Sequence, residues 1–107
     1  MPSPHRPPPG VLRALRKLGA DIREARLRRR LPMSVIAERA STSRPTLARV
    51  EKGDPSVSMG IYAAILHALG LLGGVAQLAD PVNDPMGQAL ASTELPKRAR
   101  IRDQSRD

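Results

Sequence analysis

Cysteine, tryptophan and phenylalanine are absent from this sequence, and there is a single tyrosine, Tyr62. Without cysteine the chain can form neither a disulfide nor a cysteine-ligated zinc site. Proteins that bind single-stranded nucleic acid stack bases on several aromatic side chains, so one tyrosine argues against that function. The shortage of aromatic residues also predicts an aliphatic core, small enough to favour oligomerisation.

Long apolar runs are missing as well. No stretch approaches the length of a membrane span, and the first residues lack the apolar segment of a signal peptide. We therefore expect a soluble protein without a membrane partner, located in the cytoplasm and at the nucleoid if it binds DNA.

Groups that commonly carry out catalysis are sparse. The two histidines, His5 and His67, lie far apart in the sequence, and no glycine-rich phosphate loop follows a strand pattern. The sequence predicts that the protein is not an enzyme and that it has no metal site and no cofactor.

Positive charge is in excess, with 18 lysines and arginines against 10 acidic residues and a formal net charge of +8. Residues 11–31 carry eight basic and two acidic residues, whereas residues 32–80 are balanced. Such a basic segment favours a polyanionic partner, most often nucleic acid. Solubility is an alternative explanation that fits the composition almost as well.

Helical periodicity and capping residues predict an all-α protein. Apolar residues recur every three or four positions, Ser43 and Ser58 are placed to cap helix N-termini, and Gly53 and Gly70 are placed to end helices. We expect helices at residues 11–30, 33–40, 44–52, 59–69 and 71–79. Gly19 lies inside the first of them and could mark a kink or the start of a helix nearby.

Proline and charge divide the chain into three parts. Residues 1–10 contain five prolines and are expected to form a disordered arm. Residues 11–80 are expected to form the folded domain. Residues 81–107 are rich in proline and charge, so we expect a flexible basic tail with one or two helical turns at residues 86–91, which could bind a partner or contribute to a dimer.

Residues 32–53 have the pattern of a helix-turn-helix. Two short amphipathic segments flank the polar turn at residues 41–43. In the second segment Leu47 and Val50 lie on one face, and Arg44 and Arg49 point the opposite way on a helical wheel. A buried helix, a turn and a helix with two outward arginines are typical of a major-groove reader.

Short motifs across residues 18–72 resemble the Xre/Cro family of lambda-repressor-like helix-turn-helix proteins. They are Leu18-Gly19, Ile22-Arg23, Ala25-Arg26, Ile36-Ala37, Thr46-Leu47, the run Arg49 to Gly53, and Ala68-Leu69-Gly70. The resemblance implies a compact five-helix bundle, and a dimer that binds a specific double-stranded DNA operator, in many members as a repressor.

The resemblance also implies roles for the residues of the recognition segment, 43–52. The base-reading positions are Arg44, Pro45, Thr46 and Arg49, joined by Ala48, which can offer an apolar contact to a thymine methyl. The expected phosphate contacts are Ser43, Lys52, Ser56 and Ser58.

Three further arginines have structural and functional interpretations. Arg28 and Arg30 end the first predicted helix, where cations favour the helix dipole, so capping and phosphate contact are equally good explanations. Arg26 and Glu51 match positions that form a partly buried ion pair in some family members, which implies a structural role for both.

The sequence departs from the family pattern at two positions. Met33 stands where the family often has a glutamine that helps to hold a phosphate, and this weakens one expected contact. Ser41 stands in the turn where the family favours glycine, so a left-handed backbone there would be strained.

The end of the domain has more apolar surface than a single copy needs. Leu71, Leu72, Val75 and Leu78 are therefore the expected homodimer contact. The short length and the end of the chain resemble HipB-type antitoxins, which implies a HipA-like kinase toxin as a partner. The alternatives are a stand-alone Xre-type repressor and a protein-interaction module that uses the basic surface.

Overall fold

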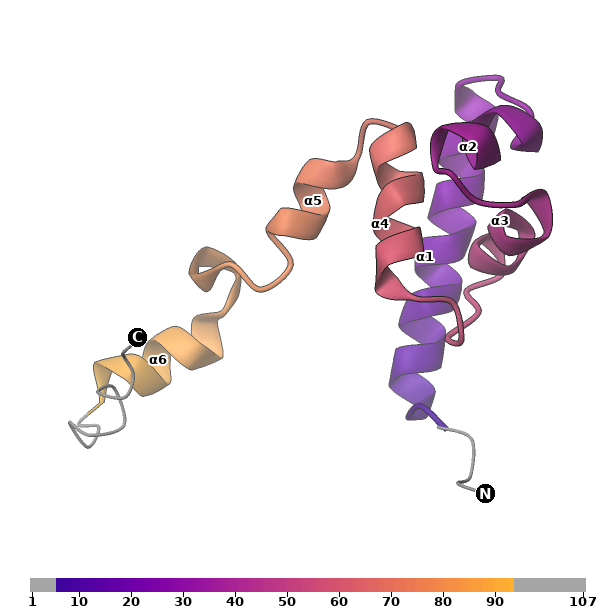
Figure 1. Cartoon of the computed structure of the whole chain (residues 1–107). Coiled ribbons are helices and arrows are strands. Elements are labelled where there is room, and N and C mark those ends of the chain that lie inside the picture. Colours follow the sequence, from indigo (N-terminus) through magenta and orange to yellow (C-terminus); the bar gives the residue numbers. More distant parts are fainter. Residues whose placement is uncertain (1–5, 94–107) are drawn as a thin grey trace. The chain divides into compact units, whose positions relative to one another are not determined.

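A computed structural model of the chain describes residues 6–93 (Figure 1). In these residues there are seven helical elements and no strand, which confirms the all-α prediction. The elements are α1 (Pro9–Arg28), α2 (Met33–Arg39), α3 (Arg44–Glu51), α4 (Met59–Ala68), α5 (Leu72–Ala76), the 3-10 helix η1 (Pro81–Asn83) and α6 (Pro85–Ser92). The chain divides into one unit that ends at Val75 and a second that begins at Ala76.

The first helix begins earlier than predicted. We expected residues 1–10 to be a disordered arm, but Pro9 and Gly10 already belong to α1. Proline is tolerated in the first turn of a helix because its missing N–H has no acceptor there. The expectation for residues 1–5 lies outside the described residues.

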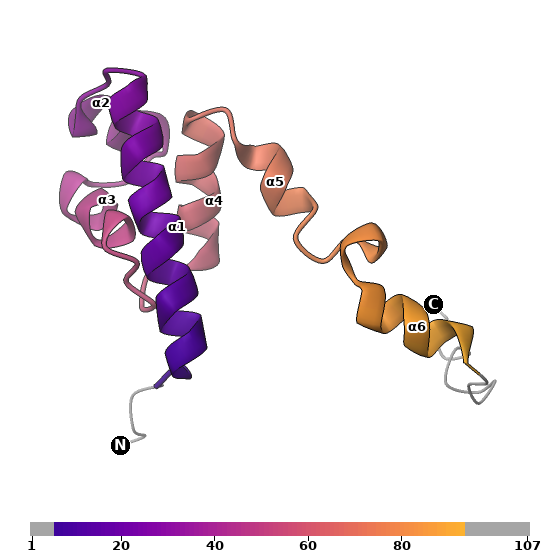
Figure 2. The same cartoon turned by 180° about the vertical axis from the view of Figure 1, so that it is seen from behind.

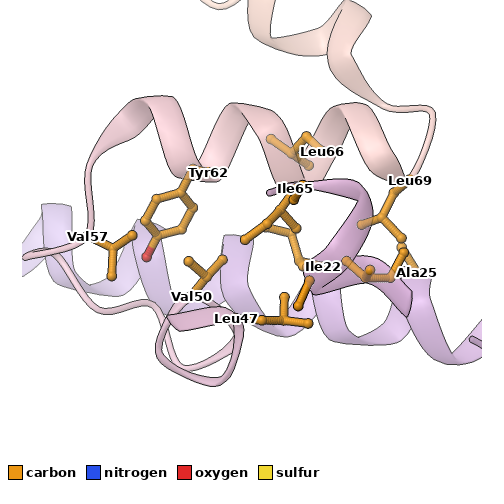
Figure 3. Close-up of a cluster of buried hydrophobic side chains, with 12 residues drawn as sticks. Ile22, Ala25, Leu47, Val50, Val57, Tyr62, Ile65, Leu66 and Leu69 are labelled. Atoms are coloured by element: carbon orange, nitrogen blue, oxygen red, sulfur yellow. The ribbon is translucent and has the colours of Figure 1, made fainter. Parts of the chain in front are cut away.

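Helices α1 to α4 form one bundle around a single apolar core, and both views show them gathered together (Figures 1 and 2). Helix α3 packs on α1, and α2 packs on α3 and α4. The core side chains are Ile22, Ala25, Ile36, Ala37, Ala40, Leu47, Val50, Val57, Tyr62, Ile65, Leu66 and Leu69 (Figure 3). Most of them belong to α1 to α4, in which apolar residues recur every three or four positions.

The expectation of an aliphatic core is wrong at one position. Tyr62 is only 3% exposed and lies between Val57 and Val50 in the core (Figure 3). Its hydroxyl donates a hydrogen bond to the main-chain oxygen of Asp54, at 2.8 Å, which satisfies the polar end of a buried ring. Burial, with the carboxylate of Asp54 as a second cause, raises the pKa of this phenol.

Gly19 is buried inside α1 because another backbone crosses it. A Cβ atom at this position would lie 2.4 Å from the main-chain oxygen of Val50 and 2.7 Å from the nitrogen of Gly53. Gly53 in turn has a φ of +76° and lies against the main chain of Leu15 and Arg16. Glycine at both positions therefore lets α1 and the end of α3 approach to backbone contact.

An ion pair between Arg26 and Glu51 also joins α1 to the end of α3. Nε of Arg26 donates to Oε2 of Glu51 at 2.7 Å, Nη2 donates to Oε1 at 3.1 Å, and Nη1 donates to the main-chain oxygen of Leu31 at 3.1 Å. The side chains are 9% and 6% exposed. The hydrogen bonds to Glu51 raise the pKa of Arg26, so the guanidinium is charged throughout the range in which the protein folds.

Helix α5 is shorter than predicted, covering Leu72–Ala76 instead of residues 71–79. It contains Gly73 and Gly74, and glycine weakens a helix interior. Of the four expected dimer residues, Val75 packs partly against the core, while Leu71, Leu72 and Leu78 are 41%, 40% and 66% exposed.

The second unit contains helical structure where we expected a mostly flexible tail. The carboxylates of Asp80 and Asp84 accept hydrogen bonds from the main-chain nitrogens of Val82 and Gly87, and so cap η1 and α6. Helix α6 contains the one or two helical turns expected at residues 86–91, η1 is an additional turn, and residues 94–107 lie outside the described residues. Within residues 6–93 no helix has the length and apolarity needed to cross a membrane.

Candidate nucleic-acid interface

In the turn between α2 and α3, Ser41 adopts the left-handed backbone conformation for which the sequence predicted strain. Ser41 has a φ of +55°. Its N–H donates to the main-chain oxygen of Glu38 at 3.0 Å, and the N–H of Thr42 donates to that of Ala37 at 2.9 Å. This is the Schellman arrangement of a helix C-terminus, which normally uses glycine. Ser41 is therefore strained, but the turn still has the geometry that glycine normally provides.

Ser43 directs the chain into α3. Its hydroxyl accepts a hydrogen bond from the main-chain nitrogen of Thr46 at 3.2 Å and donates one to the hydroxyl of Thr46 at 2.9 Å. Ser58 caps α4 in the same way through the nitrogen of Ile61. Both predicted caps are confirmed. The two hydroxyls that were expected to contact phosphates are therefore already hydrogen-bonded within the protein.

The outward face of α3 carries the predicted base-reading residues. Leu47 and Val50 are buried in the core, so the helix is fixed in rotation. Arg44, Pro45 and Arg49 are exposed, and Thr46 and Ala48 are half-buried. Lys52 is the C-cap residue of α3 and is exposed.

Met33 contributes to this face. Together with Arg44, Pro45 and Ala48 it lines one open hollow, here called the α2–α3 hollow. Sequence reasoning treated Met33 only as a lost phosphate contact. Its position at the start of α2 beside an apolar strip of α3 gives it a different use, since a thioether packs well against an apolar group.

Arg49 is held from one side. Its Nε donates to Oδ2 of Asp54 at 2.9 Å, and its Nη2 donates to the hydroxyl of Ser56 at 3.0 Å. The hydroxyl and the main-chain nitrogen of Ser56 both donate to Oδ1 of Asp54, at 2.7 and 2.8 Å. These bonds, those from Ser56 first and that from Arg49 after them, lower the pKa of Asp54 from 3.8 to about 2.

The arginines at the end of α1 are separated by role. Arg29 donates to the main-chain oxygen of Ala25 at 2.9 Å and caps the helix. Arg30 has a φ of +54° and is the left-handed residue that ends α1. Arg28 lines a second hollow together with Asp21, Leu66 and Leu71, not the α2–α3 hollow. The structure therefore gathers Arg44, Pro45, Ala48 and Arg49 on one helix face and does not bring Arg28 into the same hollow.

The sequence did not indicate that Asp54 contacts Arg49 or that Tyr62 contacts Asp54. The spacing of Asp54 and Ser56 is typical of a turn in which the aspartate accepts from the nitrogen two residues on, so that bond could have been found. The link to Arg49 depends on how α3 ends, which spacing alone does not give. Among residues 6–93 no group of three histidine, cysteine or acidic side chains is placed to hold a metal ion.

Comparison with known proteins identifies the domain. No curated protein and no solved structure matched the chain. A family model described as a helix-turn-helix domain matches residues 17–79, which include all of α2 to α5 and the second half of α1. That range covers more than half of the sequence and contains the capped turn and the outward face described above, so this chain belongs to the helix-turn-helix domain family.

Proposed function

We propose that this protein is a transcriptional regulator that binds a specific double-stranded DNA sequence by placing α3 in the major groove. The observation that supports this most is the outward face of α3, where Arg44, Pro45 and Arg49 are exposed on a helix whose rotation is fixed by the core. Within a helix-turn-helix, the second helix is the one that contacts base edges.

The chemistry of this face suits base reading. A guanidinium can donate two parallel hydrogen bonds to O6 and N7 of guanine, which discriminates against other bases by about 1–3 kcal/mol. The α2–α3 hollow, lined by Met33, Pro45 and Ala48 beside Arg44, offers an apolar surface for a thymine methyl group. We therefore propose an operator with guanines opposite Arg44 and Arg49 and a thymine against the hollow.

The test starts with the full-length protein and a random DNA library. Sequences enriched by binding give the operator, and Arg44→Ala and Arg49→Ala should each remove most of the preference for that operator over random duplex while leaving the helical circular dichroism intact. Arg23→Ala, an exposed arginine of α1, is the matched control for loss of one charge. Failure of the wild type to enrich any sequence would leave the basic surface as a protein-interaction module.

A two-fold operator requires two copies of the domain. We propose that Leu71, Leu72, Val75 and Leu78 form the homodimer contact, on the support of the exposure of the three leucines. Half-sites should then lie about one helical turn of DNA apart. Leu72→Asp should lower the molar mass measured by light scattering to that of a monomer and abolish binding to the two-fold site. A dimer that survives this change would place the contact elsewhere.

The finer proposal is that the protein is the antitoxin of a HipA-like kinase toxin and represses its own operon. It is supported by the resemblance of its layout to HipB-type antitoxins. Co-purification with the product of the neighbouring gene, together with inhibition of that product's kinase activity, tests it. If the neighbouring product does not bind, the protein is a stand-alone repressor.

A further inference from the structure

A continuous set of hydrogen bonds links the core of the domain to the exposed guanidinium of Arg49. It begins at Tyr62, whose buried hydroxyl donates to the main-chain oxygen of Asp54 at 2.8 Å. The main-chain nitrogen of Asp54 donates to the oxygen of Arg49 at 3.0 Å. The backbone of Asp54 is thereby fixed from both sides, once by the core and once by the end of α3.

The side chain of Asp54 continues this set outward. Oδ1 accepts two bonds from Ser56, at 2.7 and 2.8 Å, and these orient the carboxylate. Oδ2 accepts from Nε of Arg49 at 2.9 Å, while the Ser56 hydroxyl accepts from Nη2 at 3.0 Å. Two acceptors on a fixed loop thus grip one arginine.

The two bonds occupy one edge of the guanidinium. Nε and Nη2 share the edge nearest the aliphatic stem, so Nη1 and the second proton of Nη2 form the outer edge. Within the part of the chain that the structure describes, no protein acceptor bonds to Nη1 of Arg49. That outer edge is the planar fork that matches O6 and N7 of guanine.

We propose that Asp54 is a positioning residue that aims the outer edge of Arg49 at a guanine, and that Tyr62 anchors Asp54 for this purpose. The inference rests on the proposed DNA-binding function and adds a specificity determinant to it. Holding the arginine beforehand removes rotamers that would otherwise be lost on binding. The carboxylate also repels phosphates, so Arg49 is less available for contact that is independent of sequence.

This arrangement predicts opposite effects on specific and nonspecific binding. In the full-length protein, Asp54→Asn should reduce the preference for the selected operator over random duplex roughly tenfold. Its affinity for random duplex should be equal to or higher than that of the wild type, because a negative charge has been removed from a DNA-facing surface. Glu38→Gln, an exposed carboxylate of α2, is the control and should leave the preference unchanged.

A double-mutant cycle separates positioning from folding. If Asp54 acts through Arg49, then Asp54→Asn should have no further effect on discrimination in an Arg49→Ala background. Tyr62→Phe keeps the ring in the core and removes only the hydroxyl, so it should lower discrimination in the same direction by a smaller factor. A loss of discrimination that persists without Arg49 would overturn the proposal.

A measurement without DNA gives an independent readout. The Nε–H resonance of Arg49 in nitrogen-15 NMR spectra should be protected from solvent exchange in the wild type and in Glu38→Gln, and should lose that protection in Asp54→Asn. If the wild type selects an operator and Asp54→Asn retains full discrimination, Asp54 does not position Arg49. If the wild type selects no operator, the DNA-binding proposal itself fails, whatever the spectrum shows.

Discussion

At the scale of single residues, the pair of Arg26 and Glu51 is the clearest case of charge used for structure. Both side chains are almost fully buried, and the guanidinium makes three hydrogen bonds to the carboxylate and to the oxygen of Leu31. A buried ion pair contributes little net stability, but removal of one partner leaves a buried charge without compensation. Arg26 is therefore unavailable to DNA even though it lies in the most basic segment of the chain.

Arg26→Ala should lower the free energy of unfolding by about 3–5 kcal/mol, as measured by urea denaturation at low temperature. The double variant Arg26→Met with Glu51→Leu replaces both charges by apolar groups of similar size and should recover most of that loss. If the double variant were no more stable than Arg26→Ala, packing rather than charge would explain the effect.

The left-handed conformation of Ser41 strains its backbone. A left-handed residue with a Cβ atom costs about 1–2 kcal/mol, whereas glycine avoids this and loses about 0.4–1 kcal/mol through the entropy of the unfolded chain. Ser41→Gly should therefore raise the free energy of unfolding by about 0.5–1 kcal/mol. Thr42→Gly, next to it and without a positive φ, should lower stability instead.

At the scale of elements, the contact of α1 with the end of α3 depends on the absence of a side chain at Gly19. A methyl group there would lie within 2.8 Å of three backbone atoms, and backbone atoms cannot move aside as a flexible side chain does. Gly19→Ala should destabilise the domain by about 1–3 kcal/mol despite the better helix propensity of alanine.

Gly60 is the matched control for this prediction. It lies in α4, and a Cβ atom there would meet only the hydroxyl of Ser58 at 3.8 Å. Gly60→Ala should be neutral or stabilise the domain by up to about 1 kcal/mol, measured by the same thermal or urea unfolding. An equal effect of the two substitutions would show that the approach of α1 and α3 is looser than described.

The helices could be predicted because their signals are local. Ser43 and Ser58 cap the helices that follow them, Gly53 and Gly70 end the preceding ones, and the apolar spacing identifies the inward faces. At Gly19 the sequence suggests only a kink or a helix start, because the main chain of Val50 that packs against it is distant in sequence. Contacts of that kind are set by how elements pack, which one sequence does not show.

The candidate site was predictable to the same extent. The outward position of Arg44 and Arg49 follows from the period of α3 and the burial of Leu47 and Val50. That Arg49 is already engaged by Asp54 does not follow, since the acceptor lies beyond the end of the helix. The sequence therefore predicts which residues lie on the outward face of α3. The structure adds that Arg49 is hydrogen-bonded to neighbouring side chains.

At the scale of the whole molecule, the excess of positive charge should make the affinity for DNA depend on salt concentration. Each phosphate contact made by a lysine or arginine changes the slope of log affinity against log salt by about 0.9. Arg28→Ala and Arg30→Ala should each lower affinity for operator and random duplex alike, and should reduce that slope by about one unit. A slope unchanged by either substitution would limit these arginines to capping and packing.

The burial of Tyr62 has a practical consequence for studying this domain. Since the chain contains no tryptophan and no other tyrosine, all of its ultraviolet emission comes from one ring, whose hydroxyl bonds to the loop that holds Arg49. The unmodified protein thus has a built-in reporter of that loop. Because folding raises the pKa of Tyr62, stability should be complete below the ordinary phenol pKa of 10.0 and decline above it, as unfolding measured at a series of alkaline pH values would check.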